Sequence, residues 1–547
     1  METKFADLHC HPHMRSFNWL HKPKKPEEKS KYNPWWLILP KFKAAEEGKR
    51  AAAYSQCDMA KVVNGNLRLV FASLYPMEKG WVTGSNNLVR DRILDLRKIL
   101  GDNAFNDFLS DTLNLFLKPF FFKLGQDKGK QIALRDFAQA VFMKLPFSRI
   151  NFFQSENYDY FYELNEERKY LAKGNGIVSE TYIFIPWIKN IFVSKKKIRK
   201  EHPDEVDARG TYVIAKNGTH VKKIIEENKT AFVLSIEGSN VFNSHEPVAN
   251  VLKKLEQVKD WEEPILFITF CHHFYNFLAG QAHSLPDVAN ILVDQKKGLD
   301  EGFTNTGWDV IRYLLSLDKD NNYKPQDLKR RILIDVKHMN AISRSEFYRE
   351  IIVPCLEKGD KIPVLASHVA YSGRETLMDM ITDMGNEKDG FLAEKNGHIF
   401  NAWNINVCDE DILTVFKTGG LIGINFDQRV LGLSKEDFNN EEKHAFCIWQ
   451  NMKACMMAVL NSTENNLPPK ENAVNMICIG TDFDGYIDPV NKYPTVLEFD
   501  QFRKDLIQVI ANDPDKDKLL FNKYTPEDLV DKICFGNAYD FVVKNFI

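Results

Sequence analysis

The chain has 547 residues, of which 44% are hydrophobic and 27% charged, a composition typical of globular proteins. Its formal charge of -3 argues against nucleic acid as the main partner, because phosphate binding needs a basic surface. Nine scattered cysteines without a CxxC pair favour a reducing compartment over a disulfide framework. We recognise no signal peptide and no continuous apolar span, so we expect a cytoplasmic protein without a membrane partner.

Eight short runs rich in Val, Ile, Leu and Phe have the composition of strands that are buried on both faces of a parallel sheet. Helix-like segments, such as 308–317 and 409–416, separate most of these runs. The alternation predicts an α/β fold, a TIM-type (β/α)8 barrel of the metal-dependent hydrolase type. The predicted strands are 5–11, 67–73, 232–237, 265–271, 332–338, 363–368, 420–426 and 476–482.

A long segment interrupts this predicted barrel. About 150 residues separate the second strand from the third, far more than a usual connection between elements. We therefore divide the chain into a first part of the barrel with two strands and an irregular first loop (1–80), a mostly helical insertion (81–230) and the remainder of the barrel (231–547). The insertion is expected either to cover the barrel mouth or to pack as a side domain.

Residue types that bind metals follow six of the predicted strands, and the active sites of such barrels lie at the carboxyl ends of the strands. His9 and His11 share one face of the first strand, so both can grip one cation. Glu237 is a carboxylate on an otherwise apolar strand, where burial without a partner would be costly, and it can bridge two cations. His338 and His368 end consecutive strands and can hold a second cation.

Two further strand ends offer catalytic side chains. Asp482 ends the last strand, where it can contact a metal ion and also transfer a proton. His272 and His273 follow the fourth strand, and because neighbours on a strand point to opposite sides, we expect only one of them to face the site and stabilise an oxyanion. The ligand types suit zinc, with manganese, iron or cobalt as alternatives, and two ions per chain are expected. A hydroxide that bridges the two ions would be the nucleophile.

Several short motifs occur in an order that is typical of one enzyme family. The most telling motif is Asp482-Phe483-Asp484-Gly485. The others are Ser235-Ile236-Glu237-Gly238, Thr269-Phe270-Cys271-His272, Gly302-Phe303-Thr304-Asn305-Thr306-Gly307, Ile334-Asp335-Val336-Lys337-His338, Ala366-Ser367-His368, Asn406-Val407-Cys408-Asp409-Glu410 and Gly419-Gly420-Leu421-Ile422. Through them the chain resembles the membrane (renal) dipeptidases, peptidase family M19 of the amidohydrolase superfamily, weakly over 1–17 and well over about 230–545.

The resemblance implies a dinuclear zinc dipeptidase (EC 3.4.13-like) that acts on a small dipeptide or amide, often with a D-residue at the C-terminal position. It implies Asp482 as the proton shuttle and His272 as the residue that contacts the substrate carbonyl. It also implies that the chain can form a homodimer. The implied metal ligands are His9 and His11 for the first ion, Glu237 as the bridge, and His338 and His368 for the second ion.

Three departures from the family pattern leave the substrate open. The first strand carries His9-Cys10-His11 where the family has His-x-Asp, which removes a negative charge. Asn404-Ile405 stand where the family has an Arg for the substrate carboxylate, and Arg374 is the candidate replacement. The long insertion is also untypical. The alternatives are another amidohydrolase-type metal hydrolase, such as a phosphoesterase or nuclease, and a metal-binding barrel without catalytic activity.

Overall fold

The computed structural model describes residues 3–20, 32–38, 55–81, 147–156, 158–184, 208–287, 289, 293–434 and 436–547. All eight predicted strands are present in one parallel sheet. They are β1 (Phe5–Cys10), β3 (Leu67–Leu74), β8 (Thr230–Glu237), β9 (Ile265–Thr269), β10 (Leu333–Asp335), β11 (Val364–Val369), β14 (Leu421–Ile424) and β15 (Ile477–Ile479), and they are hydrogen-bonded in this order. Each strand therefore neighbours the next one along this series.

The sheet closes into a barrel between its first and last strands. His11 N donates to Phe483 O over 2.9 Å, and Asp482 N donates to His9 O over 2.9 Å. Cys10 also forms a parallel bridge with Phe483. These contacts join the carboxyl ends of β1 and β15, so the predicted TIM-type (β/α)8 barrel is confirmed.

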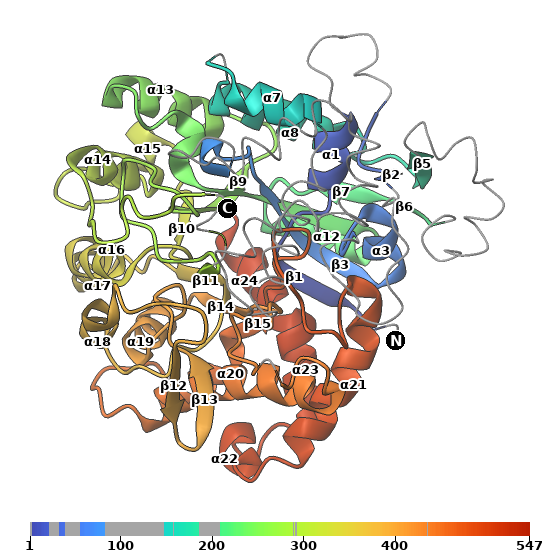
Figure 1. Cartoon of the computed structure of the whole chain (residues 1–547), viewed down its shortest axis with the longest axis vertical. Coiled ribbons are helices and arrows are strands. Elements are labelled where there is room, and N and C mark those ends of the chain that lie inside the picture. The colour runs from blue at the N-terminus through green and yellow to red at the C-terminus, as the bar shows by residue number, and fades with distance from the viewer. Residues whose placement is uncertain are drawn as a thin grey trace, which may run out of the picture.

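Helices cover the outside of the barrel, and Figure 1 shows them as a ring around the strands. The predicted helices 308–317 and 409–416 correspond to two of them. The ring contains α13 (Val248–Lys259), α14 (Asn305–Leu314), α16 (Ala341–Phe347), α17 (Val353–Glu357), α18 (Leu377–Asp383), α19 (Asp409–Thr418), α20 (Glu441–Asn461), α21 (Phe499–Ala511) and α24 (Asn537–Asn545). Smaller elements of this half are α15 (Pro325–Leu328), the π-helices η5 (Tyr348–Ile352) and η8 (Lys532–Gly536), the β12–β13 hairpin (Leu392–Lys395, His398–Asn401), the 3-10 helices η6 (Lys470–Asn475) and η7 (Val496–Glu498), α22 (Lys516–Leu520) and α23 (Pro526–Asp531).

Helix α14 illustrates why these segments are helical and how they pack. Its N-terminus is capped by Thr304, whose side-chain oxygen accepts from Gly307 N over 3.0 Å. Val310, Ile311 and Leu314 are spaced three or four residues apart and are all buried, so one stripe of the helix faces the barrel. Among the described residues, no helix has the length and apolarity that a membrane crossing requires.

The described part of the first 230 residues contains short elements around one side of the barrel. They are α1 (Met14–Leu20), β2 (Trp36–Ile38), α3 (Met59–Asn64), η2 (Lys79–Trp81), α7 (Phe147–Gln154), α8 (Tyr160–Ala172), β4 (Ser179–Glu180), β5 (Tyr182–Phe184), β6 (Arg209–Gly210), β7 (Tyr212–Ile214) and α12 (Gly218–Glu226). Strand β7 pairs in parallel with β8 and adds a ninth strand to the sheet, which the sequence did not predict. The apolar segment 105–122 of the predicted insertion lies outside the described residues, and the division of the chain at 80 and 230 stays a prediction.

Candidate metal centre

Glu237, at the end of β8, is surrounded by histidine side chains from three other strand ends. Its Oε1 lies 3.2 Å from His9 Nε2, 3.6 Å from His368 Nε2 and 3.9 Å from His338 Nε2. Its other oxygen, Oε2, lies 3.1 Å from His11 Nε2. All five side chains are buried. The barrel therefore brings five of the predicted ligands together around one carboxylate.

The ligand atoms fall into two groups that share Glu237. In each group the atoms lie within 4.8 Å of one another, and the groups are His9, His11, Glu237 and Asp482 on one side and Glu237, His338 and His368 on the other. Asp482 Oδ1 lies 3.7 Å from His11 Nε2 and 3.9 Å from His9 Nε2. With 15% of its side chain exposed, Asp482 is the most open member of the cluster. The arrangement offers two adjacent cation positions with a common carboxylate.

Two ligands lie in turns beyond their strands. Strand β10 ends at Asp335 and β15 at Ile479, whereas His338 and Asp482 follow in left-handed backbone with φ of 66° and 62°. A left-handed residue other than glycine costs on the order of 1–3 kcal/mol, and such residues concentrate at functional sites. A side chain at Gly485 would collide with Asp482 Oδ1, which explains the glycine of the Asp482-Phe483-Asp484-Gly485 motif.

A buried hydroxyl group fixes the tautomers of two histidines. Ser367 Oγ donates its single proton to Asp335 Oδ2 over 2.5 Å. Its oxygen therefore accepts from His368 Nδ1 at 2.8 Å and, more weakly, from His9 Nδ1 at 3.5 Å. Both rings then carry their proton on Nδ1 and present the lone pair of Nε2 to Glu237. This is the form in which histidine binds a metal ion.

The charges of the cluster call for cations. Burial by itself would raise the pKa of Glu237, but the nearby His272 and His9 hold that pKa well below its ordinary value, so the carboxylate is ionised. Burial opposes a charge on His11, yet hydrogen bonds to Asp482 and Glu237 raise its pKa to about 10. A carboxylate pair that attracts a proton this strongly also attracts a metal cation, which takes the proton's place.

The chemistry of the donors fits a pair of transition-metal ions. His9 Nε2 is buried and has no hydrogen-bond partner among the described residues, as expected for an atom that awaits a metal ion. Burial and neighbouring positive charge lower the pKa of His338 and His368, so both rings stay neutral with a free lone pair. Imidazole and carboxylate donors are those that zinc, manganese, iron and cobalt accept in proteins.

His272 also reaches this cluster, through a partner that the sequence did not reveal. Its Nδ1 donates to Glu78 Oε2 over 2.5 Å, and its Nε2 lies 3.5 Å from Glu237 Oε1. Glu78 is buried and also accepts from Phe274 N over 3.1 Å and from the Tyr75 hydroxyl group over 3.3 Å. It lies in the loop after β3, where no motif marks it, and its burial could be recognised only in the folded chain.

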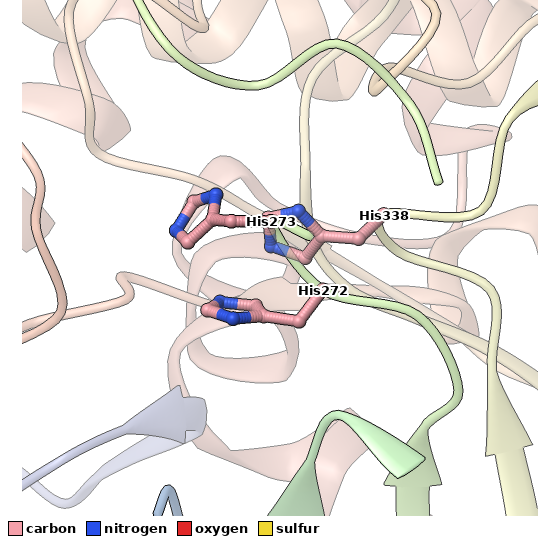
Figure 2. A group of neighbouring side chains, drawn as sticks. All are labelled: His272, His273 and His338. Carbon is pink, nitrogen blue, oxygen red and sulfur yellow. The ribbon is translucent and has the colours of Figure 1, made fainter. Parts of the chain in front are cut away.

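The expectation that only one of the two adjacent histidines faces the site is wrong. Figure 2 shows His272 and His273 projecting in the same direction as His338. The ring centroids of His272 and His273 lie 4.6 Å and 5.0 Å from that of His338. The alternation rule fails here because β9 ends at Thr269, so both histidines belong to a loop.

The structure does not bring Arg374 into the cluster. Its Nε donates to Asp383 Oδ2 over 2.6 Å, and its guanidinium group lies over the Phe391 ring. Lys337, which sequence analysis passed over, is a second basic candidate. It lies between Asp335 and His338, is buried, and its Nζ has no hydrogen-bond partner among the described residues.

No family model matches the sequence, and no curated protein matches it. The fold is similar to that of a metallopeptidase from Rhodobacter sphaeroides liganded with a phosphinate mimic of the dipeptide L-Ala-D-Ala, with a TM-score of 0.46 and 11% identity over 100% of both chains. A dipeptidase of peptidase family M19 aligns with a TM-score of 0.46 and 10% identity, over 100% of this chain and 99% of the other. The probable dipeptidase PvdM from Pseudomonas aeruginosa aligns with a TM-score of 0.41 and 12% identity, over 95% and 96%. At these scores the similarity carries no functional conclusion for this chain.

Proposed function

We propose that the chain is a metal-dependent hydrolase, a dipeptidase-like amidohydrolase that cleaves a peptide or amide bond with two zinc ions. The observation that carries this proposal is the position of Glu237 between two groups of imidazole nitrogens, at distances of 3.1 Å to 3.9 Å. His9 and His11 would hold the first ion, together with Asp482. His338 and His368 would hold the second, with Glu237 common to both. Manganese, iron or cobalt are the alternative metals.

The two ions, when bound, supply an activated water and polarise the scissile carbonyl. Asp482 is the base that takes the proton of the attacking water, because it is the most open carboxylate of the cluster. It then returns this proton to the leaving amine. His272 binds the carbonyl oxygen. Burial opposes its charge, but Glu237 and Glu78 raise its pKa, which favours an Nε2–H that can donate to an oxyanion.

A buried ammonium group would anchor the anionic end of the substrate. Arg374 is held by Asp383, whereas Lys337 Nζ is buried and has no partner among the described residues. Burial lowers the pKa of Lys337 to about 8, so the ammonium form still dominates at neutral pH. A charge-assisted hydrogen bond to a substrate carboxylate would satisfy this group. We therefore favour a small substrate with a carboxylate near the scissile bond, such as a dipeptide.

The test is hydrolysis of a dipeptide panel, with D-residues at the C-terminal position included, by zinc-reconstituted protein. Glu237→Gln is the matched variant, because it keeps the size of the side chain and removes the charge. Wild-type protein should cleave part of the panel, and the variant should lose turnover together with at least a 100-fold loss of metal affinity, since loss of an outer partner alone costs about 10- to 100-fold. Full metal content and full turnover in Glu237→Gln would contradict the proposal.

The same experiment separates the alternatives. Two bound ions without cleavage of any amide would favour a phosphoesterase, a nuclease or a barrel that binds metal without catalysis. Model phosphodiesters and phosphomonoesters then distinguish the first two from the third. Steady turnover of any amide, abolished in Glu237→Gln, would exclude the non-catalytic barrel.

A further inference from the structure

Three histidines form a group beside the two ligand groups described above. His272 and His273 come from the loop after β9, and His338 comes from the turn after β10. Their ring centroids are 3.9 Å, 4.6 Å and 5.0 Å apart. Each ring offers one nitrogen that lies within 4.8 Å of the other two, and Figure 2 shows the three side chains projecting in the same direction.

Two of the three rings are held in place by hydrogen bonds at Nδ1. His272 Nδ1 is bound to Glu78 Oε2 at 2.5 Å. His273 Nδ1 is 2.7 Å from Ser284 Oγ, and Gln295 Nε2 donates to the same oxygen over 2.5 Å and to His273 O over 2.6 Å. In both rings Nε2 remains for another ligand. Histidine ligands of metal ions are commonly held in this way, by a carboxylate or another polar group on the second nitrogen.

The third ring is poised between two groups. His338 Nε2 lies 3.3 Å from His368 Nε2, on the side of Glu237. Its Nδ1 is buried and has no hydrogen-bond partner among the described residues. An imidazole without a partner on one nitrogen, beside two oriented imidazoles, provides the three-histidine donor set that zinc, copper and nickel ions accept.

We propose that His272, His273 and His338 form a third cation site, which takes Zn²⁺ or another imidazole-preferring transition-metal ion when the metal is in excess. The site contains no carboxylate ligand of its own, so it binds more weakly than the pair around Glu237 and does not select Mg²⁺ or Ca²⁺. A cation there takes the position of the proton with which His272 would bind the substrate carbonyl. Excess metal therefore inhibits the reaction, a consequence that rests on the proposed function.

The test counts bound zinc without any substrate. Metal-free protein is dialysed against buffers of increasing free Zn²⁺, and bound zinc per chain is measured by mass spectrometry. Wild-type protein should reach a plateau of two ions and then bind a third. His273→Phe should keep the first two and lose the third, because it removes the one ligand that belongs to this site alone and preserves an aromatic ring against Trp81.

Two variants serve as controls for the fold and for the site. His283→Phe changes another largely buried histidine of the same loop, one that packs on Trp403, and should keep all three ions. Ser284→Ala removes only the hydrogen bond that holds His273 and should weaken the third site about 10-fold. Excess zinc should inhibit turnover in wild-type protein and in His283→Phe, and leave His273→Phe uninhibited.

The outcomes separate this inference from the proposed function. A plateau at two ions in wild-type protein, or a third ion retained in His273→Phe, would overturn the third site and leave the catalytic pair intact. Fewer than two ions in wild-type protein would overturn the pair itself. Loss of all zinc in His273→Phe, with an unchanged circular dichroism spectrum, would contradict the assignment of His273 to a separate site.

Discussion

Two buried polar clusters of the barrel differ in how their atoms are paired. Around α16, Arg344 donates to Asp411 Oδ1 over 3.0 Å, to Met339 O over 2.7 Å and to Asn404 O over 2.7 Å, and the Tyr348 hydroxyl group also donates to Asp411 Oδ1 over 2.9 Å. We call these residues the Arg344 cluster. Each charge in it meets an opposite charge or a hydrogen-bonding oxygen.

The metal centre is arranged in the opposite manner. His338 Nε2 and His368 Nε2 face each other at 3.3 Å, both as neutral rings, and neither can satisfy the other with a lone pair alone. His9 Nε2 and Lys337 Nζ have no partner among the described residues. Buried polar groups of folded proteins are nearly always paired. The comparison teaches that a satisfied cluster stabilises the fold, whereas an unsatisfied one is prepared for a ligand.

The largest effect on stability is expected in the Arg344 cluster. Arg344→Met should lower the free energy of unfolding by about 3–5 kcal/mol, because it leaves the buried carboxylate of Asp411 without its cation. Urea denaturation of metal-free protein measures this loss, and the zinc content of the folded fraction should not change. The double variant Arg344→Met with Asp411→Asn should recover part of the stability. A loss below about 1 kcal/mol would contradict the role given to this cluster.

Metal addition should affect the other cluster. Zinc at 100 times its dissociation constant should raise the free energy of unfolding by about 2.7 kcal/mol, because it binds the folded chain and not the unfolded one. A chelator should remove the gain. Denaturation of wild-type protein and Glu237→Gln at equal free zinc measures the difference. An equal gain in both proteins would place the metal elsewhere.

Substitution of Lys337 should weaken substrate binding and spare the metal pair. Lys337→Met should raise KM for dipeptides about 10- to 100-fold, the value of a charge-assisted hydrogen bond of roughly 1.5–3 kcal/mol. It should leave KM for the corresponding C-terminal amides nearly unchanged. The zinc content provides the control. If KM rises equally for both substrate classes, Lys337 does not bind the carboxylate.

Ser367 should influence metal affinity through the histidines that it orients. Ser367→Ala should weaken zinc binding about 10-fold, because His368 and His9 lose the acceptor that fixes their tautomers. Competition with a chromophoric chelator measures the affinity. Ser343→Ala is the matched control, since Ser343 is equally buried but bonds to Gly280. Equal losses in the two variants would show that only packing matters.

The smallest effect concerns pH and a carboxyl group beside the Arg344 cluster. Burial raises the pKa of Glu387 from 4.5 to about 7. The folded chain then binds the proton more tightly than the unfolded chain, so this group stabilises the fold below pH 4.5 and the contribution is lost as pH rises through 7. Glu387→Gln should remove that decline and add about 1 kcal/mol at pH 8, less than the full shift implies because water reaches part of the group. Denaturation at pH 5 and pH 8 measures it, and a gain at pH 5 alone would contradict the sign.

The strands and their ends were predictable because each buried parallel strand leaves an apolar run in the sequence. The same runs placed His9, His11, Glu237, His338 and His368 at one end of the barrel. Periodicity carries no information beyond a strand end. The positions of His273 and Lys337 therefore could not be predicted, since both follow the last paired residue of a short strand.

Long-range partners were the second kind of feature that sequence could not supply. Glu78 and His272 are 194 positions apart, and neither residue type nor spacing links them. Strand β7 has only three residues, fewer than a hydrophobic pattern needs to be recognised. The substrate anchor was sought as an arginine before a known motif, whereas the buried lysine that fits lies inside the fifth strand end.

The seam between β1 and β15 has a consequence for how the molecule is made. His9 and His11 are synthesised first, but they acquire Asp482 as a neighbour only when the last strand joins the first, through contacts that include the Asp7 carboxylate and Thr481. A chain that is still on the ribosome and lacks β15 can hold at most an incomplete first site. The cation pair thus becomes complete only when nearly the whole chain has emerged, and full metal loading reports that the ring has closed.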